Sequence, residues 1–367
     1  MNDVIGAHQR IDQLFKLYIR SAFPMRSAAL EAERDRAVAA PRVLSQPPLI
    51  EPAPQYPSSG HTLARAAAAL GADYEDLARL ASTMFGADTE LYRHQWESLR
   101  GATVGGRDIV VTTGTGSGKT ECFLLPVLAE LARESRGWTA PHEPDARREW
   151  WAHGSGRIGQ WSHVTRPSAV RALILYPLNA LVEDQLRRLR EILDDDGTHT
   201  WLDAARHANR VTFGRYTGQT PGSGDRNDSG SLTRLKETLK KAADAERDLR
   251  DAIRNGADAS VRYHQQSMRG GEMWSRWDMQ ETPPDILITN YSMLNIMLMR
   301  ELEEPIFDQT RRWLHEPGHP DRRFTLVIDE LHSYRGTAGT EVAYLLRLVL
   351  HRLGLTPNSE KLRVIAT

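Results

Sequence analysis

A glycine-rich segment and an acidic pair are the parts of this chain whose residue types and spacing could do chemistry. Residues 109–120 read IVVTTGTGSGKT, an apolar run that ends in closely spaced glycines, a lysine and a threonine. Such glycines let the backbone curl so that its amides point at phosphate oxygens, and a helix beginning near Lys119 adds its positive end. Lys119 would neutralise the β- and γ-phosphates, while the Thr120 hydroxyl would ligate Mg²⁺. The predicted nucleotide contacts of this loop are Thr115, Gly116, Ser117, Gly118, Lys119 and Thr120.

The acidic pair follows a second apolar run, residues 324–328. Asp329 and Glu330 would therefore lie at the carboxyl edge of a sheet, where open α/β folds bind their ligands. Asp329 can hold Mg²⁺ through a water molecule, and Glu330 can orient and deprotonate the attacking water. Together with the phosphate loop, the pair predicts a nucleoside triphosphatase. Its catalytic residues would be Lys119, Asp329 and Glu330, and its metal ligands Thr120 and Asp329.

Short apolar runs alternate with helical patterns in the second part of the chain, and these elements must position the two motifs. The predicted strands are residues 109–113, 172–176, 211–216, 286–289, 324–328 and 363–366. Amphipathic helices are predicted at 120–133, 180–193, 292–301 and 340–353. Alternation of this kind indicates an α/β fold with a mostly parallel sheet and helices on both faces. Both motifs then lie at strand ends and form one site.

The region before that domain, residues 1–87, is predicted to be a helical accessory segment. Apolar residues at helical spacing predict a helix over 11–19, and further helices are expected at 27–39, 63–70 and 74–85. Prolines between residues 47 and 57 indicate an extended connector. Two insertions interrupt the α/β domain itself, at about 137–167 and 222–282.

The two insertions carry patterns with more than one interpretation. The first contains four tryptophans, at 138, 150, 151 and 161, which could stack on bases or form the core of the insertion, the core being favoured. The second has leucines at nearly heptad spacing over about three heptads. That pattern favours a helix or hairpin packed on its own domain over a coiled coil that forms a dimer.

Composition is that of an ordinary globular protein, with 40% hydrophobic and 26% charged residues. The apolar runs fall short of the roughly 20 residues of a membrane span, and the N-terminus lacks a hydrophobic signal. The single cysteine, Cys122, excludes an internal disulfide and fits a reducing cytoplasm. A net charge of −1 provides no global basic field, so a nucleic acid would be held by local loops.

These motifs resemble those of superfamily 2 helicases of the DExH type, over residues 88–367 and thus over the first of their two RecA-like domains. Residues 113–120 are similar to motif I and residues 329–332 to motif II. The resemblance implies that the cofactors are ATP and Mg²⁺. It also implies that Gln95, in the run LYRHQ, reads the adenine edge, and that His332 has a coupling role.

Three further strand ends resemble the helicase motifs that hold one nucleic-acid strand by its phosphates. They read YPLNAL at 176–181, YTG at 216–218 and TN at 289–290. The predicted contacts are Pro177, Asn179, Thr217, Gly218, Thr289 and Asn290. Small hydroxyls, amides and helix N-termini suit a grip that is independent of base sequence. Without the resemblance, turn and cap chemistry would explain each of these residues.

The run DELHSYRGT at 329–337, together with LYRHQ at 91–95, resembles the bacterial MrfA/YprA-like and DISARM-type helicases, which act in DNA repair and phage defence. Two features depart from the family pattern. Thr113 stands where the generic phosphate loop has a glycine, and motifs I and II lie farther apart than in compact cores because of the insertions. The chain ends within what looks like motif III, residues 364–367. We therefore expect the second RecA-like domain and its arginine finger to be absent, and the fragment to be weakly active.

The sequence thus predicts the N-terminal motor domain of a cytoplasmic, ATP-dependent DNA helicase or translocase from a bacterial repair or phage-defence system. Its substrate would be single-stranded DNA or a duplex with a single-strand end. Protein partners from that system are expected, and a membrane is not. Two alternatives remain open: the duplex-translocating motor subunit of a restriction or remodelling complex, and a non-enzymatic binding platform regulated by nucleotide.

Overall fold

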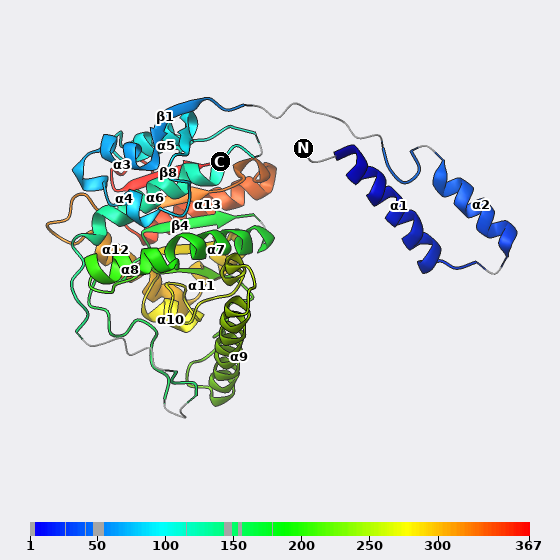
Figure 1. The fold of residues 1–367 in the computed structure, drawn as a ribbon. Helices are drawn as coiled ribbons and strands as arrows, with labels where there is room; N and C mark the ends of the chain where they lie inside the picture. The colour runs from blue at the N-terminus through cyan, green and yellow to red at the C-terminus, as the bar shows by residue number, and fades with distance from the viewer. Residues whose placement is uncertain are drawn as a thin grey trace. The chain divides into compact units, whose positions relative to one another are not determined.

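The computed structural model describes residues 4–25, 27–40, 42–46, 55–114, 116–142, 149–152, 156–177 and 179–367. The chain forms two compact units, Met1–Gln55 and Tyr56–Thr367 (Figure 1). Residues 56–87, which we assigned from the sequence to the accessory region, belong to the second unit. None of the described helices is both long and apolar enough to cross a membrane.

The first unit contains two helices, α1 (Val4–Ala22) and α2 (Ala28–Ala39), which confirms the two helices predicted there. A polar contact joins them, because Arg20 on α1 pairs with Asp35 on α2 at 3.0 Å. The apolar stripe that predicted α1 lies exposed; its members include Ile11, Leu14, Phe15 and Tyr18. The apolar side of α1 is therefore not the side that faces α2.

A parallel six-stranded sheet forms the centre of the second unit. Its strands are β3 (Ile109–Val110), β4 (Ala172–Tyr176), β5 (Phe213–Tyr216), β6 (Ile286–Asn290), β7 (Phe324–Ile328) and β8 (Leu362–Ala366). Their order is β3-β8-β7-β4-β6-β5, so β8 separates the strand before the phosphate loop from the strand before the acidic pair. All six predicted strands are confirmed. β3 is shorter than predicted because the chain turns into the phosphate loop after Val111.

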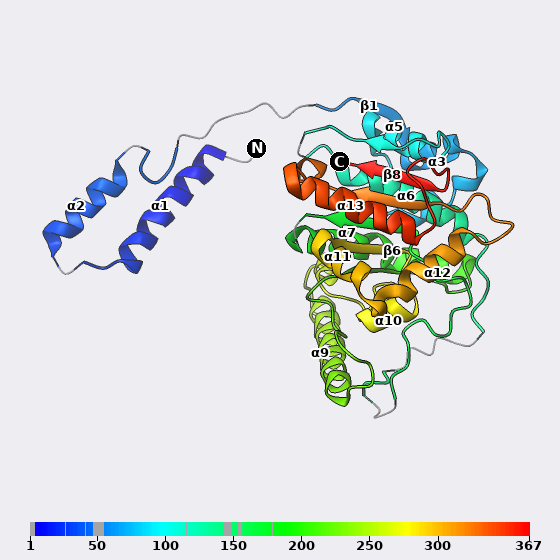
Figure 2. The same ribbon diagram turned by 180° about the vertical axis from the view of Figure 1, so that it is seen from behind.

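Helices cover both faces of this sheet (Figures 1 and 2). One face carries α5 (Arg93–Ala102), α6 (Lys119–Ser135) and α7 (Asn179–Leu193), and the other carries α11 (Tyr291–Met299), α12 (Glu304–Leu314) and α13 (Gly336–Arg352). Side chains of β4 alternate between the two cores, with Ile174 and Tyr176 in the first and Leu173 and Leu175 in the second. The predicted RecA-like α/β class is confirmed.

Residues 58–92 pack beside α6 as part of the second unit. They form β1 (Ser58–Thr62), α3 (Leu63–Leu70), a 3₁₀ turn (Ala72–Tyr74), α4 (Leu77–Leu80) and β2 (Glu90–Tyr92), which pairs antiparallel with β1. The predicted helix at 63–70 is confirmed, whereas the one at 74–85 is wrong in length. The hydroxyl of Thr83 donates to the carbonyl of Glu191 at the end of α7, 2.8 Å away. α4 ends at Leu80, and Thr83 lies in the turn that follows it.

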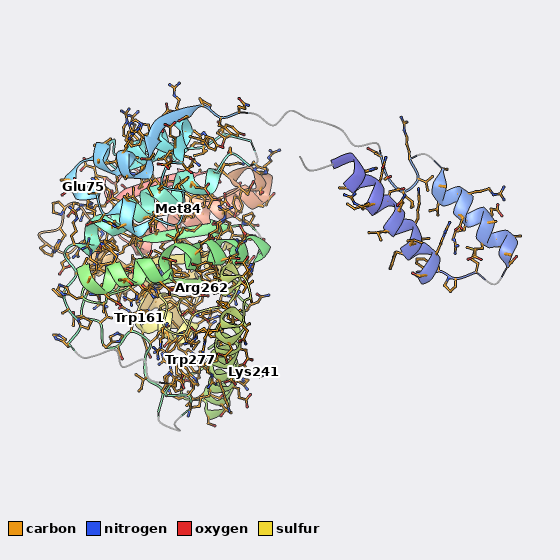
Figure 3. All side chains as sticks on the ribbon, viewed as in Figure 1. Glu75, Met84, Trp161, Lys241, Arg262 and Trp277 are labelled. Atoms are coloured by element: carbon orange, nitrogen blue, oxygen red, sulfur yellow. The ribbon has the colours of Figure 1, made fainter. Side chains whose placement is uncertain are left out.

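The two insertions share one aromatic core. Its members are Trp150 and Trp151 from the first insertion and Leu235, Leu239, Ala243, Met268, Trp274 and Trp277 from the second. Trp151 and Trp274 meet edge to face with their ring centroids 5.0 Å apart. Trp277 and Lys241 lie on opposite sides of α9 (Ser229–Arg254) in Figure 3. The four tryptophans of the first insertion are all buried, but only Trp150 and Trp151 form this core, as favoured; Trp138 and Trp161 pack in the two cores on either face of the sheet instead. The favoured packing of α9 within its own unit is confirmed.

Three further short elements belong to this part of the chain. They are α8 (Asp196–Ala205), a 3₁₀ segment (Ala259–His264) and α10 (Arg276–Glu281). Arg262, labelled in Figure 3, lies on the 3₁₀ segment and pairs with Asp196 at 2.7 Å. The second insertion is thereby tied to α8 as well as to the tryptophan core.

Asp285 anchors three strands at the amino edge of the sheet. It is fully buried, directly precedes β6 and accepts two hydrogen bonds from Arg166, at 2.8 and 2.7 Å. Arg171, just before β4, lies 2.9 Å away, and the amide of Thr212, just before β5, donates at 2.7 Å. Burial alone would raise the pKa of Asp285, but the two guanidiniums outweigh it and hold the pKa below its usual range.

Asp285→Asn should lower the free energy of unfolding by about 3–5 kcal/mol, because it leaves two buried guanidiniums without their counter-charge. Chemical denaturation at pH 7 measures this loss. Since folding depresses the pKa of Asp285, its contribution is present at neutral pH and is lost as the pH falls below the 3.8 of a free aspartate and through the folded pKa. Glu97→Gln, which breaks an exposed pair with Arg93, is the control and should cost less than about 1 kcal/mol. Equal losses for the two variants would contradict the anchoring role.

Candidate nucleotide and nucleic-acid site

The phosphate loop runs from the end of β3 into α6. Gly116 and Gly118 both have φ of +75°, a left-handed conformation that favours glycine, and Gly118 caps α6. The hydroxyls of Thr113 and Ser117 lie 2.6 Å apart across the loop. The threonine in the place of the usual glycine therefore closes the curl through its side chain.

Helix α5 supports this loop from behind. Gln95 is only 3% exposed, accepts a hydrogen bond from the amide of Tyr92 at 2.9 Å, and places Nε2 3.4 Å from the carbonyl of Gly118. Nε2 of His94 lies 2.8 Å from the carbonyl of Ser117. Gln95 thus lies at the loop, as the site prediction requires, with its amide turned toward the backbone. Its role in reading adenine stays a prediction.

The structure brings the loop and the acidic pair together although they are far apart in sequence. Lys119 and Thr120 form the first turn of α6. The Lys119 ammonium is near enough to favour the charged form of Asp329. Thr115, also predicted to touch the nucleotide, lies outside the described residues.

Asp329 and Glu330 follow β7 and meet the end of β8. The Thr367 hydroxyl is hydrogen-bonded to Oδ1 of Asp329 and accepts from the amide of Glu330 at 3.3 Å. Burial raises the pKa of Asp329 and the charge of Glu330 raises it further, while the hydrogen bond from Thr367 opposes the rise. A divalent cation would offset the cost of this partly buried charge. Mg²⁺ takes hard oxygen ligands, which the Asp329 carboxylate and the Thr120 hydroxyl provide.

Glu330, assigned to water activation, has a left-handed backbone with φ of +51°, which is uncommon for a residue other than glycine. Such strained positions gather at functional sites. Its carboxylate lies 3.1 Å from Nδ1 of His332, whose side chain is 63% exposed. The coupling role of His332 stays a prediction.

Strand register places one residue from the end of each of five strands in a single row of residues across the carboxyl edge of the sheet. This row joins the predicted nucleotide site (the nucleotide half) to the predicted nucleic-acid contacts (the nucleic-acid half). Tyr176 pairs with Asn290, and the register of β4 and β7, extended by one residue, aligns Tyr176 with Asp329. Extending the register of β7 and β8 by one residue aligns Asp329 with Thr367, and extending that of β5 and β6 aligns Thr217 with Asn290. The ladder does continue there, since the amide of Asp329 bonds the β4 carbonyl just before Tyr176 at 3.1 Å. By strand alternation this row, from Thr367 to Thr217, faces the layer of α6 and α7.

The six predicted nucleic-acid contacts all lie at or just beyond the ends of β4, β5 and β6: Pro177, Asn179, Thr217, Gly218, Thr289 and Asn290. Thr217 and Thr289 are buried, and the Thr289 hydroxyl donates to the last carbonyl of β5 at 2.7 Å. Asn290 caps α11 through its side chain, and the side chain of Asn179 lies outside the described residues. Gly218 is exposed. A phosphate backbone would therefore meet main chain and helix ends here, rather than the threonine hydroxyls.

Three hydroxyl groups near Asp329 were not among the predicted site residues. They belong to Thr367, Tyr176 and Tyr334. The hydroxyls of Tyr176 and Tyr334 are buried, and neither reaches a hydrogen-bond partner in the part of the chain that the structure describes. Burial raises the pKa of Tyr334 to about 12, with the charge of Asp329 adding to the rise. In the sequence, Tyr176 belongs to the run YPLNAL and Tyr334 to the run DELHSYRGT, neither with a predicted role; their places at the end of a strand and just after the acidic pair are the signals that point to the site.

The chain is similar to known proteins. Residues 92–217 match the family model of the DEAD/DEAH box helicase. The chain is 32% identical over 408 residues to the Druantia protein DruE of Escherichia coli (strain UMEA 4076-1), a match that covers 99% of this chain and 20% of DruE. This chain contains a DEAD/DEAH box helicase domain.

The chain is also 32% identical over 258 residues to the uncharacterized ATP-dependent helicase YprA of Bacillus subtilis (strain 168), a match that covers 70% of this chain and 20% of YprA. The chain thus spans about one fifth of the length of these curated relatives. The predicted relationship to superfamily 2 and to the MrfA/YprA group is confirmed. DruE is named as a Druantia protein, and the DISARM-type likeness stays a prediction.

Two solved structures align with the helicase domain. The DUF1998 helicase MrfA bound to DNA and AMPPNP matches 80% of this chain and 26% of its own, at 20% identity and a TM-score of 0.41. The DEAD-box helicase Mss116 bound to ssRNA and UDP-BeF matches 84% of this chain and 41% of its own, at 13% identity and a TM-score of 0.44.

Gly118→Ala should destabilise the nucleotide-free helicase domain more than Gly116→Ala. Both positions have φ of +75°, which costs alanine about 1–2 kcal/mol. A Cβ at Gly118 would also clash with Nε2 of Gln95, which is buried and anchored at Tyr92, whereas a Cβ at Gly116 meets open space. We expect a further loss of about 1–3 kcal/mol from this overpacking, measured by chemical denaturation. Equal losses would show that α5 does not hold the loop.

Proposed function

We propose that this chain is the ATP-binding motor domain of an ATP-dependent helicase or translocase that acts on DNA, either single-stranded or as a duplex with a single-strand end. The observation that supports this most is the row at the carboxyl edge. In it Tyr176 alone separates Asp329, in the nucleotide half, from Asn290 in the predicted nucleic-acid half. Neighbouring strands of one sheet can pass a displacement from one half to the other.

The residues divide the chemistry as follows. Lys119 and the loop amides hold the β- and γ-phosphates, Thr120 and Asp329 hold Mg²⁺, and Glu330 takes a proton from the attacking water. Bound Mg²⁺ supplies charge neutralisation at the transferred phosphoryl group. Helicases of this family complete the site with an arginine finger, commonly worth about 10³-fold or more, from a second RecA-like domain. We therefore expect weak hydrolysis from residues 1–367 alone.

The setting we propose is the cytoplasm of a bacterium, in a phage-defence or DNA-repair system whose other proteins are partners of this helicase. The likeness to DruE over nearly the whole chain supports that setting, because it includes the segment before the helicase motifs as well as the motifs themselves.

Two substitutions in the full-length protein test the nucleotide site. Lys119→Ala should abolish ATP binding, because it removes the cation at the phosphates, and Glu330→Gln should retain binding but stop turnover, because an amide cannot take the water's proton. Fluorescent-nucleotide titration and phosphate release measure the two properties. Lys240→Ala, on the exposed side of α9, is the control and should leave both unchanged. Normal turnover by Glu330→Gln would show that another group activates the water.

Displacement assays on the full-length protein test the motor activity. We expect ATP-dependent release of a strand from a duplex with a single-strand end, and its loss in Lys119→Ala. Displacement of a third strand from a triplex without separation of the duplex would instead favour a duplex-translocating motor. Absence of both activities would favour a binding platform.

A further inference from the structure

The hydroxyl of Tyr176 makes no hydrogen bond to the residues that the structure describes. The residue is fully buried at the end of β4. Leaving a buried hydroxyl unpaired costs roughly 1–3 kcal/mol. Phenylalanine would fill the same space without that cost. The hydroxyl is therefore available to an acceptor when ligands bind.

Burial raises the pKa of the Tyr176 phenol, and of the carboxylates near its hydroxyl, that of Asp329 raises the pKa most, ahead of Asp184 on α7. In the row itself, Tyr176 lies between two possible acceptors. On one side lies Asn290, whose side-chain oxygen accepts from the amide of Met293 at 2.8 Å in the cap of α11. On the other side lies Asp329, whose carboxylate offers about four lone-pair positions and in this structure takes the Thr367 hydroxyl on Oδ1. A phenol is a good donor to a carboxylate, and the resulting bond to a charged acceptor is among the stronger ones in proteins.

Tyr176 directly precedes the predicted nucleic-acid contacts in the chain. The next residue is Pro177, the first of the predicted nucleic-acid contacts, and Tyr176 is the last residue of β4 in register with β6. Any nucleic acid that moves residue 177 also moves the ring beside Asp329. One residue thus joins a backbone position in one half of the site to a side-chain position in the other.

We propose that Tyr176 is a positioning residue that couples the two halves of the site: when nucleic acid and Mg²⁺–nucleotide are both bound, its hydroxyl donates a hydrogen bond to the Asp329 carboxylate. The bond would fix the direction of the carboxylate that holds the metal, and no proton is transferred. This inference rests on the proposed function, because it requires both ligands to bind at this edge.

Tyr176→Phe in the full-length protein removes the hydroxyl and little else. With saturating single-stranded DNA, we expect kcat for ATP hydrolysis to fall about tenfold while KM for ATP changes by less than about twofold. The ratio of DNA dissociation constants without and with Mg²⁺–AMPPNP, measured by fluorescence anisotropy, should move toward one, because the coupling free energy is lost. The melting temperature of the nucleotide-free protein should not fall, because no hydrogen bond is broken in that state.

Tyr74→Phe is the matched control. It removes a hydroxyl that bonds Glu130 at 3.0 Å outside the row, and should leave turnover and coupling at their wild-type values. Unchanged kcat and unchanged coupling in Tyr176→Phe would overturn the proposal. A lower melting temperature with a proportional loss of nucleotide binding would make the hydroxyl structural and would overturn it too. If the wild-type protein shows neither DNA-dependent hydrolysis nor coupling, the proposed function itself fails, and this inference falls with it.

Discussion

Parallel pairing of the six strands puts the carboxyl end of each strand at one edge of the sheet, and every functional residue of this chain depends on that constraint. The register is set at the opposite edge, where the buried carboxylate of Asp285 is bound by groups that directly precede β4 and β5. Those strands, with β6, end in Tyr176, Tyr216 and Asn290, and Thr217 directly follows β5. The buried ion cluster around Asp285 therefore helps to align the three strand ends at the opposite edge of the sheet. The row formed by those ends continues into Asp329.

Much of this arrangement could be predicted because its signals are local. Runs of apolar residues marked all six strands, and the glycines before Lys119 and the acids after β7 marked the two ends of the nucleotide site. The rest depends on contacts between distant segments. Thr367 and Tyr176 matter because register sets them beside Asp329, and nothing within their own segments shows it. The segment predicted as a helix at 74–85 also makes such a contact, because Thr83 in the turn after α4 bonds the end of α7.

The nucleic-acid half shows how structural and functional interpretations of the same residue can coexist. Turn and cap chemistry explains the side chains of Thr289 and Asn290, which are used within the sheet edge. The hydrogen bonds of these two side chains hold the backbone at the ends of β5 and β6, close to Gly218. The edge therefore presents ordered main chain to a ligand. Outside that edge, the two insertions form a common tryptophan core, a pairing of segments about 120 residues apart that no local pattern reveals.

An experimental structure of the full-length protein with single-stranded DNA and Mg²⁺–AMPPNP tests the central claim most directly. The account predicts the nucleotide phosphates within the curl formed by Gly116 and Gly118, and the DNA backbone across the ends of β4, β6 and β5, along the row that contains Asp329. DNA bound elsewhere on the domain, for instance at the amino edge near Asp285 with the row left bare, would contradict it.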